Sequence, residues 1–435
     1  MNGQLNSEQQ LAIDKIIEGN FTYFGLQGKG GTGKTFLLNF LPYHWKIAYT
    51  APTHKAVSVF ILNGLPEDDC YTIYALMGLQ VNEANGNVTL DKNNKSKAHK
   101  YDLVVIDEAS MISTRLIVFI KEMVAENPYI KVIFMGDSHQ LPPVGEQLSP
   151  AFKMVDDSVT LVKQMRQSAT DHPLTNLLDD LRNAIDNNTR IINFGAYNAQ
   201  VVDTESGRKV GIVVTNKKDR FENWIVKSCL DDRNFNNIVT AYTNEKVDQY
   251  NKLIHDVKYN KDEYFSIGET VIVQNPIKRS AMLKTNKGHK AIIYTIGKEI
   301  KVAKISYHTK EFKVGDELEL FNYAIITDAE TDNIIRCLLD NSSFNKWWDV
   351  KAKAIKKPGF DFSYNWQKLY EIRDYFAQVK LSYAVTAHKS QGSTYDNVFI
   401  DVPNIQSMRE LQKIINNCLY VAISRAKYTA ILLVK

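Results

Sequence analysis

Short apolar runs alternate with helix-like segments in the first third of the chain. Residues 21–26, 103–106 and 132–135 are largely or wholly apolar, which is typical of buried strands. Between the last two runs, apolar side chains recur at the i, i+3, i+4, i+7 spacing of a helix, at Leu116, Phe119, Ile120 and Met123. This alternation predicts a parallel sheet covered by helices, with a site at the carboxyl ends of its strands.

The pattern changes in residues 262–375. Four short β-branched runs, separated by glycine and lysine, predict a small barrel: 270–273, 291–296, 300–305 and 324–327. Six lysines make this stretch basic, as a solvated face or as a DNA contact: Lys284, Lys287, Lys290, Lys298, Lys301 and Lys304. The aromatic and basic residues of 347–366 could stack on single-stranded DNA or pack between subdomains.

A polar hairpin is predicted earlier in the chain. Two strand-like runs, 80–84 and 87–90, flank Asn85-Gly86. Asn-Gly is the dipeptide that a two-residue type I′ turn prefers, because both central residues must take positive φ. The segment is either a pin that separates strands or a plain surface hairpin.

Composition adds few constraints. The chain has 435 residues, 44% apolar and 23% charged, which is typical of a globular protein of about two to four domains. A net charge of +4 permits nucleic-acid binding without arguing for it. No run approaches the roughly 18 apolar residues of a membrane span. The cysteines are far apart, which disfavours zinc and disulfides and suits a reducing cytoplasm: Cys70, Cys229, Cys337 and Cys418.

The strongest chemical signal is the phosphate-loop pattern G-x-x-x-x-G-K-[ST] at residues 28–35. It lies between a predicted strand and a predicted helix, which makes a chance glycine-rich turn the weaker interpretation. Lys34 would contact the β/γ-phosphates, and the Thr35 hydroxyl would ligate Mg²⁺. The other loop residues would turn backbone N–H groups toward the phosphates: Gly28, Gly30, Gly31, Thr32 and Gly33.

Two acids complete an ATPase signature. Asp107 and Glu108 directly follow the apolar run 103–106. An acid at the end of such a strand, beside a phosphate loop, holds Mg²⁺, so Asp107 is the predicted metal ligand. Glu108 would then polarise the attacking water as general base. Gln140 follows the next strand and could sense the γ-phosphate. The alternative for Asp107-Glu108 is a solvated turn.

Together these segments resemble a known family. The chain is similar to superfamily 1 helicases of the RecD-like 5′-to-3′ branch, and above all to the small phage Dda helicases. Eight segments follow the family's order: 5–9, 50–56, 107–108, 136–140, 164–167, 241–244, 386–394 and 420–426. They resemble the Q motif, motif Ia, motifs II, III and IV, the family's next strand, and motifs V and VI.

The resemblance implies roles for further residues. Gln9 would read adenine, and Gln391 and Gly392 would help bind the nucleotide. Arg166 and Arg425 would reach across a cleft to the γ-phosphate and stabilise the charge of the transferring phosphoryl group. Without the resemblance, both arginines would be read as partners in surface ion pairs.

The resemblance also implies contacts with DNA. The residues expected to contact the strand come from motifs Ia and V: Pro52, Thr53, His54, Thr386, His388 and Lys389. Tyr74 stands where these proteins usually carry histidine. A tyrosine can stack on a base, but it can equally pack in the core.

The implied fold is α/β, with two RecA-like parallel-sheet domains. The first, at residues 1–152, would carry a β-hairpin insertion at about 77–100. The second would comprise residues 153–261 and 376–435, with an SH3-like β-barrel inserted at 262–375. The implied cofactors are ATP and Mg²⁺.

The implied function is an ATP-dependent DNA helicase that moves 5′-to-3′ on single-stranded DNA, in phage replication or recombination. Its expected partners are single-stranded and duplex or fork DNA, with a single-stranded-DNA-binding protein as a further candidate. No membrane association is expected, and we expect a functional monomer in the cytoplasm, that of the host cell if a phage encodes the protein. Two alternatives remain: a translocase that remodels protein–DNA complexes with little unwinding, and a phosphate-loop metabolic kinase.

Overall fold

The computed structural model describes residues 5–82, 87–90, 95–163, 173–202, 207–231, 236–277, 281–284, 294–314, 317–355 and 362–435. For residues 80–82, 87–90, 282–284, 355 and 362–365 only the backbone is described. The chain forms two compact units, residues 1–247 with 385–435 and residues 248–384, and each is described by itself.

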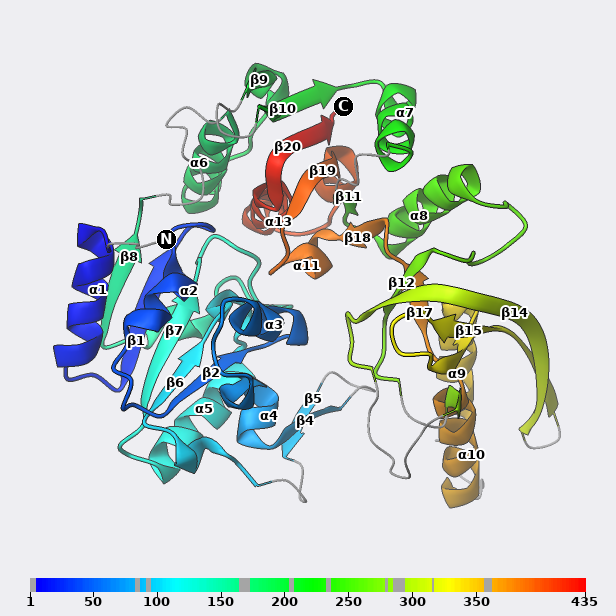
Figure 1. The fold of residues 1–435 in the computed structure, drawn as a ribbon, viewed down its shortest axis with the longest axis horizontal. Helices are drawn as coiled ribbons and strands as arrows, with labels where there is room; N and C mark the ends of the chain where they lie inside the picture. The colour runs from blue at the N-terminus through cyan, green and yellow to red at the C-terminus, as the bar shows by residue number, and fades with distance from the viewer. Residues whose placement is uncertain are drawn as a thin grey trace. The chain divides into compact units, whose positions relative to one another are not determined.

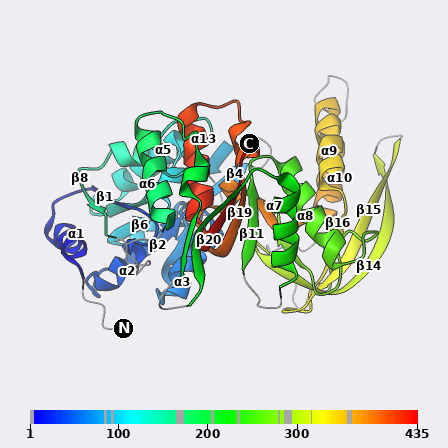
Figure 2. The ribbon, with the colours of Figure 1, turned by 90° about the horizontal axis from the view of Figure 1, so that it is seen from above.

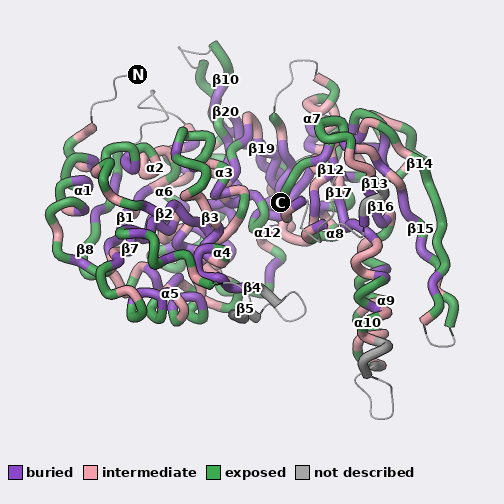
Figure 3. Tube along the Cα trace, turned by 60° about the horizontal axis from the view of Figure 1, so that its bottom comes forward, coloured by how far each residue is buried: buried purple, intermediate pink, exposed green. Residues whose placement is uncertain are grey.

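The first sheet of the larger unit is parallel, in the order β3-β2-β6-β7-β1-β8 (Figure 1). Its strands are β1 (Tyr23–Gly28), β2 (Ile47–Ala51), β3 (Cys70–Thr72), β6 (Leu103–Ile106), β7 (Lys131–Gly136) and β8 (Asp157–Leu161). Helices cover both faces, so the central strands are apolar at successive positions. Figure 3 shows the buried positions running along β1, β2 and β7.

Helices divide between the two faces of this sheet. On one face pack α1 (Ser7–Glu18), α2 (Lys34–Leu37) and α3 (His54–Leu62). On the other pack α4 (Ile73–Met77) and α5 (Thr114–Glu126). Short 3₁₀ helices lie in the connections of this unit: Leu38–Phe40, Glu67–Asp69, Ala98–Lys100, Ala109–Met111, Pro150–Lys153 and Phe194–Tyr197.

The expected hairpin forms, but in another register. Strands β4 (Leu79–Asn82) and β5 (Asn87–Leu90) are antiparallel, and Asn82 pairs with Asn87. Four residues therefore separate the paired ends, whereas a two-residue turn at Asn85-Gly86 would pair residues 84 and 87. The prediction of a type I′ turn is wrong in its register. Residues 83–86 lie outside the described part of the chain.

The second sheet has the order β18-β11-β19-β20-β10-β9. It contains β9 (Ala199–Val202), β10 (Lys209–Thr215), β11 (Asn237–Ala241), β18 (Ala384–Thr386), β19 (Tyr395–Asp401) and β20 (Ala426–Leu433). The neighbours β11, β19, β20 and β10 are parallel, and β9 is antiparallel to β10. Two α/β sheets with parallel cores confirm the predicted fold class.

Helix α13 (Gln412–Ser424) is the most buried helix of this half, and it packs on one face of the sheet with α6 (Pro173–Asp186) and α12 (Val402–Gln406). The other face carries α7 (Lys218–Cys229), whose Phe221 contacts Phe399 of β19. This half also contains α11 (Ala387–Ser390), while α8 (Asn244–Lys258) begins in the larger unit and continues into the smaller one.

The smaller unit is built on a sheet with the order β13-β16-β15-β14-β12-β17. Its strands are β12 (Thr270–Val273), β13 (Met282–Lys284), β14 (Glu299–Val314), β15 (Glu317–Asp328), β16 (Ile334–Leu338) and β17 (Val379–Leu381). Ala377, just before β17, exchanges backbone hydrogen bonds with β16, so the sheet curls toward closure. The β-rich insertion is thus present, while its SH3-like identity stays a prediction.

The aromatic segment of this unit folds as two helices, α9 (Asn341–Ile355) and α10 (Phe362–Tyr375), which lie beside the long β14–β15 hairpin (Figure 2). The Trp347 ring lies 5.0 Å from the ring of Phe321 on β15, and Trp348 lies 6.5 Å from Trp366. These contacts favour the packing interpretation of residues 347–366 over stacking on DNA. The β-branched runs that predict the barrel give no indication of these two helices.

The domain boundaries expected from the sequence stay predictions. One boundary cuts across a sheet: residue 152 precedes β8, which pairs with β1 in the first sheet. Of the basic insertion, Lys287 and Lys290 lie outside the described residues, and Lys298 pairs with Glu330. None of the helices in the described ranges is long and apolar enough to cross a bilayer.

Phe134 offers a test of the first sheet's core. Its side chain is fully buried in β7, and the Tyr23 ring lies 6.1 Å away. Phe134→Ala should lower the free energy of unfolding by about 3–5 kcal/mol, because it leaves a cavity between the sheet and α5. Thermal unfolding followed by circular dichroism measures the loss. Val118→Ala, at a half-exposed position of α5, is the matched control and should cost less than about 0.5 kcal/mol. Equal losses would contradict the described core.

Candidate active site

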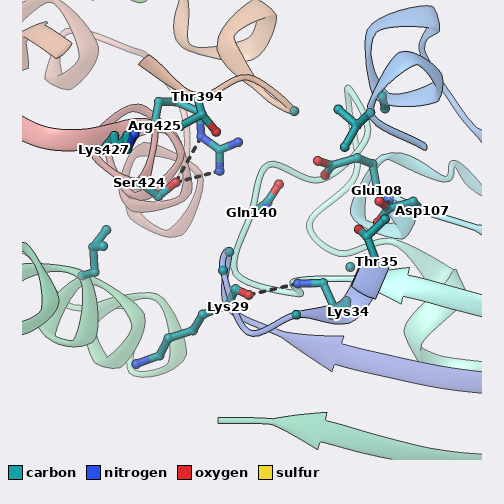
Figure 4. A pocket seen from close by; sticks show the side chains of 18 of the residues that line it. Lys29, Lys34, Thr35, Asp107, Glu108, Gln140, Thr394, Ser424, Arg425 and Lys427 are labelled. Atoms are coloured by element: carbon teal, nitrogen blue, oxygen red, sulfur yellow. Dashed lines mark hydrogen bonds between the residues drawn. The ribbon is translucent and has the colours of Figure 1, made fainter. Parts of the chain in front are cut away.

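A cavity of about 410 Å³ lies between the first and second sheets of the larger unit. Figure 4 shows Lys34, Thr35, Asp107 and Glu108 on one side and Arg425 on the other. The first sheet supplies the phosphate loop and the segments after β6 and β7. The second supplies α6, residues 392–394 and residues 424–427. The site therefore needs both halves of this unit.

The phosphate loop connects β1 to α2 in a conformation that requires glycine. Gly31 and Gly33 have φ of 85° and 86°, and Gly33 is the N-cap of α2. The Lys34 ammonium folds over the loop and donates to the carbonyl oxygens of Gly28 (2.7 Å) and Lys29 (3.0 Å). Burial lowers the pKa of Lys34, against the charges of nearby carboxylates that raise it. A buried ammonium above a glycine loop is well suited to an anionic phosphate group.

The acidic wall follows β6. Glu108 adopts a left-handed conformation, with φ of 52°, and its backbone N–H donates to the Asp107 carboxylate at 2.8 Å. Left-handed backbone at a residue other than glycine carries strain that is often found at functional sites. Burial, followed by the charge of Glu108, raises the pKa of Asp107 to about 6. Two crowded acids thus share this wall, and the charge of Lys34 offsets the rise in the pKa of Asp107 only in part.

This wall fits Mg²⁺. The Asp107 carboxylate and the Thr35 hydroxyl are oxygen donors that lie on the same side of the cavity (Figure 4). The described residues contain no group of three or more His, Cys, Asp or Glu that could hold a metal. Mg²⁺ usually binds through one or two carboxylates together with substrate phosphates, so one carboxylate and one hydroxyl are sufficient here.

Gln391 connects the general-base candidate to the other sheet. Its amide nitrogen lies 3.3 Å from Glu108 Oε2, 3.1 Å from Ser110 Oγ and 3.0 Å from Gln140 Oε1. An amide has two N–H donors, so three acceptors share them. Gln391 is buried behind the cavity wall rather than lining it. It can therefore orient Glu108 and Gln140.

Arg425 lines the cavity from the end of α13 and is 7% exposed. Its guanidinium donates to the carbonyl oxygens of Val421 (3.2 Å) and Ser393 (3.3 Å) and to Ser424 Oγ (2.8 Å). These contacts hold the planar group at the cavity, opposite Lys34 (Figure 4). The geometry suits stabilisation of charge on a phosphate between the two residues.

Most of the residues predicted for the nucleotide and metal site line this one cavity: Gly30, Gly31, Gly33, Lys34, Thr35, Asp107, Glu108, Gln140, Gly392 and Arg425. Gly28 and Thr32 lie in the loop beside it without lining it. Arg166 lies outside the described residues. Sequence reasoning missed Lys427 and the three residues of α6 that line the cavity, Thr175, Leu178 and Asp179, because none of them lies in a recognisable motif.

Gln9 occupies an unexpected position. It is 1% exposed and does not line the cavity. Its Nε2 donates to the Thr32 carbonyl at 3.2 Å, and its Oε1 accepts from the backbone N–H of Asn6 at 3.1 Å. In this structure Gln9 joins the N-cap of α1 to the phosphate loop. Its adenine-reading role stays a prediction.

The expected DNA contacts lie at the starts of two helices. Thr53 caps α3, which begins at His54, and Thr386 caps α11, in which His388 and Lys389 are exposed. The Lys55 ammonium lies 5.6 Å from the Tyr395 ring centre, so the start of α3 lies beside the chain that follows α11.

The two remaining expected contacts are partly buried. Pro52 is half-buried at the end of β2. Tyr74 is also half-buried and packs against the core of the first sheet, which favours the packing interpretation. The DNA roles of all these residues stay predictions.

Family models match both halves of the larger unit. Residues 4–197 match the model described as an AAA domain. Residues 381–433 match the model of a UvrD-like helicase C-terminal domain.

Curated relatives match along almost the whole chain. The ATP-dependent DNA helicase dda of Enterobacteria phage T4 is 26% identical over 440 residues, covering 96% of this chain and 95% of the relative. The RecBCD enzyme subunit RecD of Buchnera aphidicola (subsp. Acyrthosiphon pisum) is 23% identical over 461 residues, covering 97% of this chain and 71% of that subunit.

Two solved structures share the fold. One describes DNA unwinding at forked duplex DNA by two coordinating Pif1 helicases; it has a TM-score of 0.51 and 18% identity, covering 99% of this chain and 92% of that one. The other is a Pif1 helicase from Bacteroides in complex with ADP-AlF3 and single-stranded DNA, with a TM-score of 0.50 and 16% identity, covering 99% and 92%. At this identity the likeness shows the fold alone.

Glu108 is the side chain whose chemistry is most directly testable. Glu108→Gln should keep ATP binding but lower the turnover number by about 100-fold or more, because an amide cannot accept the proton of the attacking water. Steady-state phosphate release and equilibrium binding of a fluorescent ATP analogue measure the two effects. Glu122→Gln, on the exposed face of α5, is the control and should behave as the parent. Parental turnover by Glu108→Gln would reject this residue as the base.

Proposed function

We propose that this chain, a Dda- and Pif1-like helicase of superfamily 1B, hydrolyses ATP to move 5′-to-3′ along single-stranded DNA and to unwind duplex DNA. One observation carries the proposal most directly. Lys34 from the first sheet and Arg425 from the second line the same cavity. A nucleotide bound there contacts both sheets, so its hydrolysis alters the forces that hold them together. This is the coupling that a motor requires.

The residues of the chain divide the chemistry among them. Lys34 binds the β/γ-phosphates, and Thr35 and Asp107 hold Mg²⁺, which neutralises phosphate charge when it is bound. Glu108 accepts the proton of the attacking water. Gln140 contacts the γ-phosphate from the end of β7, and Arg425 stabilises charge on the transferring group from the opposite wall. Gln391 orients both Glu108 and Gln140 through its side-chain contacts with them.

The DNA strand is proposed to cross the starts of α3 and α11. His54 at the first and His388 and Lys389 at the second are exposed. Partial burial of their rings lowers the pKa of both histidines, which favours the neutral form that can hydrogen-bond to or stack on DNA. Alternating grip by the two helices during the ATP cycle would move the strand in one direction.

Relatives of this chain support the choice of partner. The phage relative is an ATP-dependent DNA helicase, and the Pif1 structures concern forked duplex DNA and single-stranded DNA. We extend these partners to this chain. Action as a monomer, a place in phage replication or recombination in the host cytoplasm, and cooperation with a single-stranded-DNA-binding protein complete the proposal.

The alternatives make different predictions. A metabolic kinase needs an acceptor-substrate site and gives no reason for an arginine from a second sheet to line the cavity. A remodelling translocase shares the motor and the DNA stimulation but lacks efficient unwinding. Stimulation of ATP hydrolysis by single-stranded DNA therefore excludes the kinase, and strand displacement separates the other two.

Polarity can be tested with tailed duplexes. Substrates with a 5′ single-stranded tail should be unwound, and equal duplexes with a 3′ tail should not, because the motif set resembles the 5′-to-3′ branch. A gel or fluorescence assay of strand displacement measures the difference. DNA affinity should fall by about 10³-fold or more between 50 and 200 mM salt if six or more backbone phosphates are contacted. Unwinding from the 3′ tail alone would overturn the polarity.

The hairpin β4–β5 is the candidate strand separator. Replacing residues 82–88 by a short Gly-Ser turn should lower the rate of duplex unwinding, while DNA-stimulated ATP hydrolysis stays within about twofold of the parent. The reason is that this hairpin forms its own two-stranded sheet, apart from the strands that carry the cavity. Parallel unwinding and ATPase assays on one preparation separate the effects. Unchanged unwinding would assign strand separation to another element.

A further inference from the structure

Three residues on one face of α6 make charged contacts with the half of the larger unit that contains the first sheet. Residues 179, 182 and 186 follow the i, i+3, i+7 spacing of a single helical face. Each of them contacts a residue of the first-sheet half. The three pairs are Asp179 with Lys29 of the phosphate loop, Arg182 with Asp137, and Asp186 with His139.

The central pair joins a buried carboxylate to a half-buried guanidinium. Asp137 is 1% exposed, and Arg182 Nη1 lies 2.8 and 2.9 Å from its two carboxylate oxygens. The Tyr420 hydroxyl of α13 donates to the same carboxylate at 2.6 Å. Burial would raise the pKa of Asp137, but the hydrogen bond from His139 and the charges of Arg182 and Lys34 hold it well below its ordinary value. The carboxylate is thus ionised in a buried environment, and Arg182 is the cation that α6 contributes to it.

This pair fixes a segment that belongs to the active site. Asp137 begins the turn that ends at Gln140, which lines the cavity. From α13, Asn417 Nδ2 donates to the carbonyl oxygens of His139 (2.6 Å) and Gln140 (3.2 Å). Helices α6 and α13, which pack on the second sheet, therefore both bond to this turn of the first-sheet half. These contacts hold Gln140 in its position.

We propose that Arg182 is a positioning residue that couples closure of the two sheets to the placement of Gln140, a role that rests on the proposed ATP-driven function. Arg182 acts through Asp137. When the sheets close, Asp137 is dehydrated and Arg182 supplies the positive charge that it needs. When they separate, water solvates both ions. The ion pair makes the closed arrangement specific, because a shifted α6 would leave a buried charge without its partner.

A double-mutant cycle isolates this coupling. Arg182→Met removes the cation that α6 supplies and keeps an apolar side chain, so closure would bury the carboxylate with only its contacts to His139, Tyr420 and Lys34. Asp137→Asn keeps the shape and removes the negative charge. The double variant has neither ion, and replacing both members of a buried pair is far less costly than breaking it. The turnover number of DNA-stimulated ATP hydrolysis and the KM for ATP are measured for all four proteins, together with the melting temperature.

Arg182→Met should lower the turnover number by about tenfold or more. The double variant should recover most of that loss, so the two effects are strongly non-additive. Arg182→Lys should recover part of it, since an ammonium supplies the charge on a differently shaped side chain. Asp186→Asn is the matched control on the same helix face: its carboxylate is 63% exposed, so turnover should stay within about threefold of the parent.

The outcomes are distinguishable. A parent protein without DNA-stimulated hydrolysis rejects the proposed function itself. A parent with such hydrolysis, matched by Arg182→Met at an equal melting temperature, rejects the role of Arg182. Losses that simply add in the double variant, or that follow the melting temperature alone, reduce the pair to a structural contact and overturn the proposal.

Discussion

A nucleotide cavity whose walls come from two different sheets constrains everything else in the larger unit. The carboxyl ends of parallel strands gather loops at one edge of a sheet, and here β1, β6 and β7 deliver the phosphate loop, the acids and Gln140. None of these strands can supply a cation from the opposite direction. The second sheet supplies it through Arg425 at the end of α13. The chemistry is thereby tied to the relative position of the two sheets.

The charges in the cavity are balanced for a bound nucleotide rather than for the protein alone. Lys34 loses hydration on its wall, and burial beside Glu108 raises the pKa of Asp107 to about 6. A bound triphosphate would offset the first cost and a bound Mg²⁺ the second, because the triphosphate would bring negative charge to Lys34 and the metal would bring positive charge to Asp107. Desolvation of Lys34 and Asp107 is unfavourable while the cavity is empty. The same desolvation strengthens their electrostatic interactions with charged groups that bind in the cavity.

The sequence predicted what depends on short stretches of chain. A phosphate loop and two acids after a strand are local patterns, and the apolar runs at 103–106 and 132–135 match β6 and β7. Contacts between distant segments that lie outside the family's motifs were not predictable. Arg182 and Asp179 are ordinary helix residues until the fold brings α6 to the cavity. The register of the β4–β5 hairpin differs from that of a two-residue turn, because pairing along the strands sets it as well as turn preference.

The polar character of the contact between the sheets explains how it can be both specific and reversible. Asp137, Gln391 and Asn417 are almost fully buried, yet each makes hydrogen bonds to the opposite half. An apolar interface of the same size would gain free energy from almost any close packing and would resist opening. Hydrogen-bonded groups gain only from the matched arrangement, and water replaces their partners when the sheets separate. A network of this kind suits the contact that we propose to open and close in each ATP cycle.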